Sequence, residues 1–161
     1  MVGHLQSNKT GRAIELFVAI HSVDSIELAE RVDRLAGETR HSPYPVYLQV
    51  NVDGDPAKAG FAPAQLTSIA PRIAALENLE VRGLMTVGRV VPTRAAGRPT
   101  FRALRELSET VRASEPRIGS GLSMGMSDDF EVALEEGATV IRLGRVLFGK
   151  RPSPEAKRPS P

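Results

Sequence analysis

Four short apolar runs in this chain end in polar residues that packing alone does not require. Serine, asparagine and aspartate often end strands for local turn chemistry, and for any single run that explanation is sufficient. Four such ends in one chain favour a shared binding site, because the carboxyl ends of parallel strands gather on one side of a sheet. The four ends are His4-Leu5-Gln6-Ser7-Asn8-Lys9, His21-Ser22-Val23-Asp24-Ser25, Gln49-Val50-Asn51 and Leu122-Ser123-Met124-Gly125-Met126-Ser127.

The segment Ser123-Met124-Gly125-Met126-Ser127 combines hydroxyl groups with a glycine, directly before the acidic pair Asp128-Asp129. Backbone amides exposed at such a turn can bind an anion. The same residues also suit an ordinary helix start, with Ser127 as N-cap and the two acids complementing the helix dipole. Spacing alone leaves both interpretations open.

Arg142 lies inside the apolar run Val140-Ile141-Arg142-Leu143, which a glycine follows. Arginine is seldom buried without a partner, so Arg142 meets a carboxylate, meets a ligand acceptor or reaches water, and spacing does not choose among these. His4 suits either a ligand contact or a satisfied, half-buried histidine. Met85 and Met124 suit core filling more than a cofactor contact.

Composition excludes several classes of function. The 161 residues carry a formal charge of +2 and only 4% aromatic residues, which disfavours a nucleic-acid-binding protein. No cysteine is present and the three histidines are scattered, so we expect no metal site. No stretch approaches the roughly 20 apolar residues of a membrane span, and the N-terminus lacks a secretory signal pattern. The expected compartment is the cytoplasm.

Short β-branched runs alternate with amphipathic stretches, a pattern typical of parallel βα units. We expect one α/β domain over residues 1–149 and a disordered, proline-rich basic tail over 150–161. Gly37 and Gly137 suit helix C-caps. The predicted strands are Val2–Gln6, Phe17–Val23, Val46–Asn51, Leu79–Val87, Gly121–Met124 and Thr139–Leu143. The predicted helices are Lys9–Glu15, Ser25–Ala36, Pro63–Glu77, Pro99–Ser114 and Asp128–Glu136.

Repeated βα units form either an open doubly wound sheet or a closed barrel. A dinucleotide-binding fold would need a G-x-G-x-x-G turn after its first strand, and the chain has none. The pattern does not otherwise decide between the two.

Six motifs in order resemble the pyridoxal phosphate homeostasis family, from Val2 to about Gly149. Any one of them is weak evidence, but their joint order and spacing make chance agreement a poor explanation. The motifs are Gly3-His4-Leu5-Gln6-Ser7-Asn8-Lys9, His21-Ser22-Val23-Asp24-Ser25, Leu48-Gln49-Val50-Asn51 with Lys58-Ala59-Gly60-Phe61, Gly83-Leu84-Met85-Thr86, Leu122 to Asp128, and Ile141-Arg142-Leu143-Gly144 with Phe148-Gly149.

The resemblance implies a (β/α) TIM-type barrel similar to the alanine racemase N-terminal domain, with about six of the eight βα units present. It implies pyridoxal 5'-phosphate as cofactor, held at the carboxyl ends of the strands. The Ser123 hydroxyl and the amides of Met124, Gly125, Gly144 and Arg145 would bind the phosphate. Arg142 would face the pyridine nitrogen, and His4, Asn51 and Met85 would line the pocket. Arg145 departs from the small residue that the family more often has there.

Family members begin with roughly two further βα units, the first of which carries the lysine that forms the Schiff base. We therefore expect an N-terminally truncated chain that lacks this lysine and has no catalytic residue. The implied function is that of a non-enzymatic carrier or buffer of pyridoxal 5'-phosphate, with apoenzymes that use the cofactor as recipients. The alternative is an amino-acid racemase or related enzyme, which needs that lysine and an acid-base partner on the opposite face of the ring.

Overall fold

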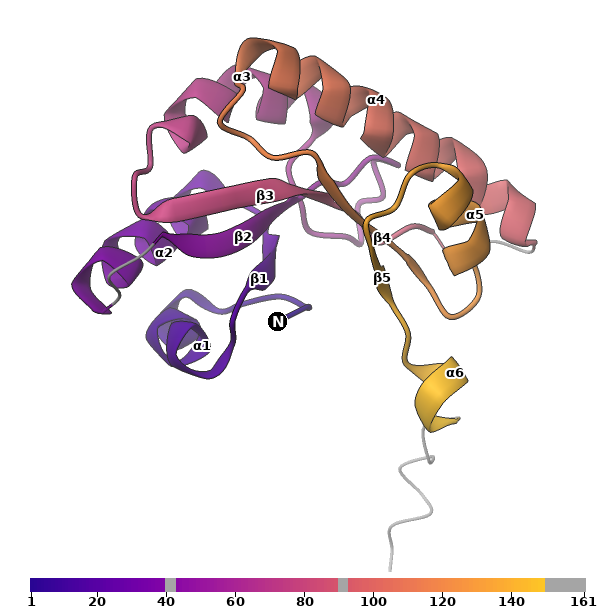
Figure 1. Cartoon of the computed structure of the whole chain (residues 1–161), viewed down its shortest axis with the longest axis horizontal. Helices are drawn as coiled ribbons and strands as arrows, with labels where there is room; N and C mark the ends of the chain where they lie inside the picture. The colour runs from indigo at the N-terminus through magenta and orange to yellow at the C-terminus, as the bar shows by residue number, and fades with distance from the viewer. Residues whose placement is uncertain (40–42, 90–92, 150–161) are drawn as a thin grey trace, which may run out of the picture.

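A curved sheet of five parallel strands forms the centre of the protein (Figure 1). The structure is a computed structural model, and it describes residues 1–39, 43–89 and 93–149. The strand order in the sheet is the chain order, β1-β2-β3-β4-β5. The strands are β1 Ile20–Val23, β2 Tyr44–Gln49, β3 Leu79–Met85, β4 Gly121–Met126 and β5 Val140–Arg142.

Helices connect successive strands, and α3 and α4 cover one face of the sheet (Figure 1). Pro63 opens α3 at its first turn, where a proline sacrifices no hydrogen bond. The Ser25 hydroxyl caps α2 by accepting the Leu28 amide at 3.2 Å. The helices are η1 Ser7–Lys9, α1 Thr10–Leu16, α2 Ile26–Thr39, α3 Pro63–Ala74, η2 Arg94–Gly97, α4 Arg98–Ser114, α5 Phe130–Glu135 and α6 Arg145–Phe148.

The core lies between the sheet and these helices. Strand register places Leu48, Leu84 and Leu122 side by side on the helix-facing side, and all three are buried. From α2, Leu28 and Val32 pack into the same cluster, as their helical spacing predicts. One face of each strand and one stripe of each helix therefore supply a continuous apolar layer.

The opposite face of the sheet has a different composition. Tyr47, Gly83 and Gly121 are in register across β2, β3 and β4. Gly83 has φ +150°, and a Cβ added there would lie 1.9 Å from the Gly121 carbonyl oxygen. A Cβ on Gly121 would in turn lie 2.9 Å from the Tyr47 ring. Gly121 therefore leaves the space that the tyrosine ring fills, and Gly83 allows the backbone of β4 to approach β3.

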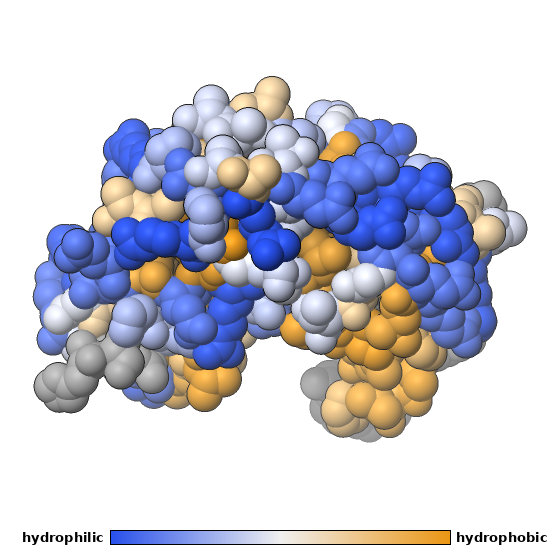
Figure 2. All heavy atoms as spheres, turned by 45° about the horizontal axis from the view of Figure 1, so that its top comes forward, coloured by the Kyte–Doolittle hydropathy of each residue, from blue (hydrophilic) through white to orange (hydrophobic). Residues whose placement is uncertain are grey.

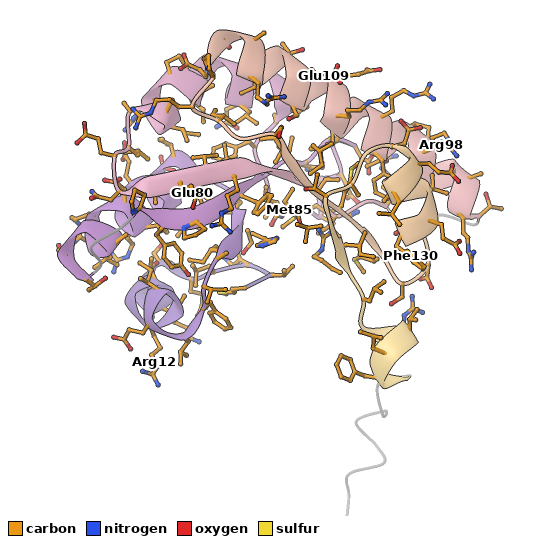
Figure 3. The ribbon with its side chains drawn as sticks, in the orientation of Figure 1. Arg12, Glu80, Met85, Arg98, Glu109 and Phe130 are labelled. Carbon is orange, nitrogen blue, oxygen red and sulfur yellow. The ribbon has the colours of Figure 1, made fainter. Side chains whose placement is uncertain are left out.

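A buried carboxylate joins α4 to the residue after α5. Glu136 is 4% exposed and its Oε1 accepts a hydrogen bond from Arg98 at 2.9 Å. Arg102 and Arg105 lie 3.6 and 3.4 Å from the same carboxylate. The hydrogen bond from Arg98 and the charges of Arg102 and Arg105 hold the pKa of Glu136 below its ordinary value, against the opposing effect of burial. Figure 3 shows Arg98 at the end of α4 that lies beside α5.

The predicted strand Val2–Gln6 is wrong, so five strands are present in the described residues instead of six. Met1 alone pairs with β1: its amino group donates to the Ala19 carbonyl at 2.6 Å, and the His21 amide donates to the Met1 carbonyl at 2.9 Å. Gly3, at φ +104°, then turns the chain out of extended conformation.

The two glycines that were predicted as helix C-caps have different outcomes. Gly137, at φ +94°, does follow α5 as a helix end. Gly37 does not end α2, which continues to Thr39; its missing side chain instead leaves room for Asn78, whose Nδ2 would lie 2.8 Å from an added Cβ.

Helix α6 was not predicted. The expected disordered tail, 150–161, lies outside the described residues, and the proposed domain division stays a prediction.

Exposed apolar residues cluster at both edge strands. Leu16, Phe17 and Val18 precede β1, and the apolar residues of α6 follow β5, where Phe148 is 85% exposed. Figure 2 shows the hydrophobic surface of α6 as a separate lobe. Among the described helices, none has the length and apolar content needed to cross a membrane.

We expect Gly83→Ala to lower the free energy of unfolding by at least about 3 kcal/mol, because the methyl group meets backbone and the φ angle is unfavourable for alanine. Urea unfolding followed by circular dichroism measures the change. Gly11→Ala is the matched control: nothing lies within 4 Å of an added Cβ in α1, so stability should be unchanged or up to about 1 kcal/mol higher. An unchanged unfolding midpoint for Gly83→Ala would contradict the packing described above.

Candidate functional site

The guanidinium of Arg142 lies across the carboxyl ends of β3 and β4. Its Nη1 donates to the Ser123 carbonyl at 2.8 Å and to the Ser123 Oγ at 2.9 Å, and its Nη2 donates to the Thr86 carbonyl at 2.7 Å. No carboxylate in the described part of the chain pairs with it. Burial lowers the pKa of Arg142, while the charge of Asp129 raises it. The sequence left open a carboxylate, a ligand acceptor or water as the partner of Arg142; in the structure the half-buried guanidinium instead faces neutral acceptors of the protein itself.

His21 reaches the same hydroxyl from the far edge of the sheet. Its Nδ1 lies 2.9 Å from the Ser123 Oγ, although β2 and β3 separate the two strands. In a flat sheet, three strand spacings of about 4.8 Å would keep these side chains apart. The contact therefore requires a strongly curved sheet, as in a barrel.

The imidazole of His21 is held in a positively charged, half-buried setting. Its ring lies 4.3 Å from the Tyr47 ring, centroid to centroid, at an angle of 31°. Burial, together with the charges of the amino terminus, Arg142 and Arg82, lowers the pKa of His21 to about 4. His21 is therefore neutral at neutral pH.

A cleft of about 350 Å³ opens beside Arg142. Both signs of charge line it: Arg89 and Arg94 are cationic, and Asp128 and Asp129 are anionic. The Asp129 carboxylate also accepts the Met126 amide at 2.7 Å, which fixes the start of α5. The complete lining is Gly88, Arg89, Thr93, Arg94, Phe101, Gly125, Met126, Asp128, Asp129 and Arg142.

Gly125 brings the end of β4 against α5. It has φ +90°, and a Cβ there would lie 2.6 Å from the Ala133 Cβ and 3.1 Å from the Phe130 Cα. A side chain at this position would displace the helix from the cleft. The glycine of the Ser-Met-Gly-Met-Ser segment is therefore required by packing, and its amide contact with a phosphate stays a prediction.

Ser127 does not cap α5, which begins at Phe130, so that interpretation is wrong. Its Oγ instead accepts the amides of Gly144 and Val146, at 3.3 and 3.4 Å. Two amides thus converge on one oxygen atom at the end of β5. The side chain of Arg145 turns away from this point and pairs with the exposed Asp128 carboxylate.

His4 and Asn51 line a neighbouring cleft of about 450 Å³. His4 is exposed, and its Nδ1 lies 3.3 Å from the Asp24 carboxylate. The Asn51 side chain closes its own loop: it donates to the carbonyls of Asp55 and Lys58, at 2.8 and 3.1 Å, and accepts the Asp55 amide at 3.0 Å. Neither residue lines the cleft beside Arg142.

The two predicted methionines lie on opposite faces of the sheet. Met85 is buried in register with Ser123, on the side of Arg142, near the centre of the view in Figure 3. Met124 belongs to the core beneath the helices, so its side chain does not face the site. Sequence reasoning did not place His21 among the binding residues; the signal that could have found it is its position one residue before the buried Ser22, on the inner face of a short strand.

Comparison with known proteins gives a consistent assignment. The family model described as "Alanine racemase, N-terminal domain" matches residues 1–152. The pyridoxal phosphate homeostasis protein of Pseudomonas aeruginosa is 44% identical over 153 residues, which cover 93% of this chain and 63% of that protein. That of Synechocystis is 37% identical over 150 residues, covering 93% and 68%. The chain thus spans about two thirds of the length of these relatives.

Solved structures agree with this match. PipY of Synechococcus elongatus with PLP bound superposes with a TM-score of 0.85 at 41% identity, over 92% of this chain and 69% of that one. Alanine racemase of Clostridium difficile superposes with a TM-score of 0.70 at 15% identity, over 96% and 40%, which shows the shared fold alone. The predicted barrel class is confirmed: the five strands form part of a barrel of this type.

We expect the His21 imidazole to stay neutral in the folded chain until the pH falls to about 4. The unfolded chain takes up the proton near the ordinary value of 6.5, so the contribution of His21 to stability is complete above that pH and is lost as the pH falls towards 4. Nuclear magnetic resonance titration of the imidazole protons measures this, with the spectrum of His21→Asn assigning the signal. Titration of His21 near pH 6.5 in the folded chain would contradict the buried contact with Ser123.

Proposed function

The chain belongs to the pyridoxal phosphate homeostasis protein family, with the barrel of the alanine racemase N-terminal domain, and on this premise we propose that it binds pyridoxal 5'-phosphate beside Arg142. The observation that carries the proposal is the Arg142 guanidinium, which lies half-buried at the strand ends with a hydroxyl and two carbonyls as its only partners among the described residues. Such a cation, next to a cleft, suits a ligand acceptor.

The remaining donors fit a phosphate ester. The Ser123 hydroxyl and the Gly125 amide belong to β4, and the Gly144 amide follows β5. Of these three residues only Gly125 lines the cleft, while Ser123 is buried against Arg142 and nothing lies within 4 Å of a Cβ built on Gly144. A phosphate oxygen could take the place that the Ser127 hydroxyl holds between the amides of Gly144 and Val146. In the proposed complex the amides of Met124 and Arg145 complete this set, while Met85 lines the inner face.

Arg142 would face the pyridine nitrogen of the cofactor. When bound, pyridoxal 5'-phosphate supplies a reactive aldehyde on an electron-withdrawing ring. A guanidinium does not protonate the nitrogen that it faces, so the ring withdraws electrons less strongly. This arrangement supports a cytoplasmic carrier or buffer that delivers the cofactor to apoenzymes, without catalysis of its own. His4 and Asn51 line the neighbouring cleft, so we assign them no direct contact with the phosphate or with the ring nitrogen.

The lysines of the described residues do not supply a free amine to the cleft. Lys58 donates to the carbonyls of Val87 and Gly88, at 3.0 and 2.6 Å, and its Nζ lies 3.9 Å from the Asp55 carboxylate. Lys9 lines a separate cleft near α1. We therefore propose that this chain holds the cofactor by phosphate and ring contacts alone.

Ser123→Ala should weaken the binding of pyridoxal 5'-phosphate by about 1 kcal/mol, or about 2–3 kcal/mol if the lost hydrogen bond is charge-assisted. Titration calorimetry measures the affinity. Ser68→Ala, an exposed serine on α3, should bind as the unchanged chain does. Arg142→Met should also lose affinity, whereas Arg145→Met should change it little, because Arg145 is proposed to bind through its backbone amide and its side chain is paired with Asp128. Equal affinities for all four variants would remove the cofactor from this cleft.

Bound pyridoxal 5'-phosphate should be removable by dialysis, and borohydride should fix no stoichiometric adduct on one lysine, because the association rests on non-covalent contacts. Mass spectrometry of the reduced and digested protein checks this and separates random surface labelling from a single site. A stoichiometric adduct on Lys9 or Lys58 at micromolar cofactor would show that the covalent site lies within this chain.

A further inference from the structure

The Ser123 hydroxyl lies within hydrogen-bonding distance of two nitrogen atoms, and these determine whether it donates or accepts. Arg142 Nη1 and His21 Nδ1 each lie 2.9 Å from the Ser123 Oγ. A guanidinium can only donate, so one lone pair of the oxygen is committed to Arg142. A neutral imidazole nitrogen either donates or accepts, according to its tautomer. His21 therefore determines whether the Ser123 proton is free.

We propose that His21 is a positioning residue for the phosphate site: it controls, through its tautomer, whether the Ser123 hydroxyl can donate a hydrogen bond to the phosphate of pyridoxal 5'-phosphate. The proposal rests on the proposed function, and it adds a residue from the opposite edge of the sheet to the site.

The proton count gives two states. With its proton on Nε2, His21 accepts the Ser123 proton at Nδ1, and the hydroxyl has nothing left to donate. With its proton on Nδ1, His21 donates to the Ser123 Oγ, which then accepts from both His21 and Arg142 and keeps its own proton for a third group. A phosphate oxygen only accepts at neutral pH, so the second state is the one that binds phosphate. Binding thus moves one proton between the two imidazole nitrogens through solvent and needs no net proton uptake.

The surroundings of His21 favour a change of tautomer over protonation. The charges that act on the ring are those of the amino terminus of Met1, Arg142 and Arg82, all cations, and the Tyr47 ring lies 4.3 Å from it, centroid to centroid. These cations oppose the formation of an imidazolium, which is the direction of the lowered pKa of His21. The His21 amide donates to the Met1 carbonyl at 2.9 Å, so the backbone that carries the ring is also held.

A double-mutant cycle on this chain tests the proposal, with pyridoxal 5'-phosphate and pyridoxal as the two titrants. His21→Phe keeps an aromatic ring on Tyr47 but removes the Nδ1–H donor that, in the phosphate-binding state, fixes the direction of the Ser123 proton, so it should weaken pyridoxal 5'-phosphate binding about fivefold. In a Ser123→Ala background the same change should have no effect. Pyridoxal, which lacks the phosphate, should not discriminate between histidine and phenylalanine. His21→Asn places an amide nitrogen at the position of Nδ1 and should bind as the unchanged chain does.

Nitrogen-15 chemical shifts of the His21 imidazole in the unchanged chain give a second, mutation-free measurement. Addition of pyridoxal 5'-phosphate should increase the population protonated on Nδ1. A fivefold loss that persists in the Ser123→Ala background, or that appears equally for pyridoxal, would overturn the proposal, as would a tautomer population that the cofactor does not change. Absence of any pyridoxal 5'-phosphate binding by the unchanged chain would overturn the proposed function itself, and the role of His21 with it.

Discussion

The site depends on how the guanidinium of Arg142 obtains hydrogen-bond acceptors. A charge removed from water without a carboxylate partner is costly unless neutral dipoles surround it. Here the acceptors come from Ser123 on β4 and from Thr86 just beyond β3, while the arginine itself ends β5. The carboxyl ends of β3 and β5 must lie close to Ser123 in β4 for all these bonds to form. Sheet curvature also brings His21 from β1 to the same hydroxyl. Residues on or next to β1, β3, β4 and β5 therefore meet around Ser123.

The two faces of the sheet have different roles: one packs against the helices and the other carries residues of the site. Towards the helices, the leucines in register give the apolar layer that stabilises the fold. On the inner face, the Tyr47 ring lies against Gly121, and Met85 and Ser123 follow two residues closer to the carboxyl ends of β3 and β4. A one-residue slip of any strand would exchange these faces and place polar groups in the core. The register that stabilises the fold is therefore the register that assembles the site.

Much of this arrangement could be predicted from the sequence. The βα order, the start of α3 at Pro63 and the helix end at Gly137 follow from local rules that tertiary contacts do not override. The strand Val2–Gln6 was wrong because an apolar run does not reveal that Gly3 turns the chain. At the site, the motifs identified Ser123 and Arg142 but could not show that His21 joins them from three strands away, or that Asn51 uses its side chain to close a loop. Those are properties of curvature and loop closure, which no short segment encodes.

The strand order has a consequence for biosynthesis. Because each strand pairs with the strand that precedes it in the chain, a growing polypeptide leaving the ribosome presents every new βα unit to a neighbour that has already been made. None of the five described strands has to wait for a distant downstream segment before it finds its place in the sheet. Arg142 is made with β5, after β1 to β4, so its hydrogen bonds to Ser123 and Thr86 form on strands that have already been synthesised.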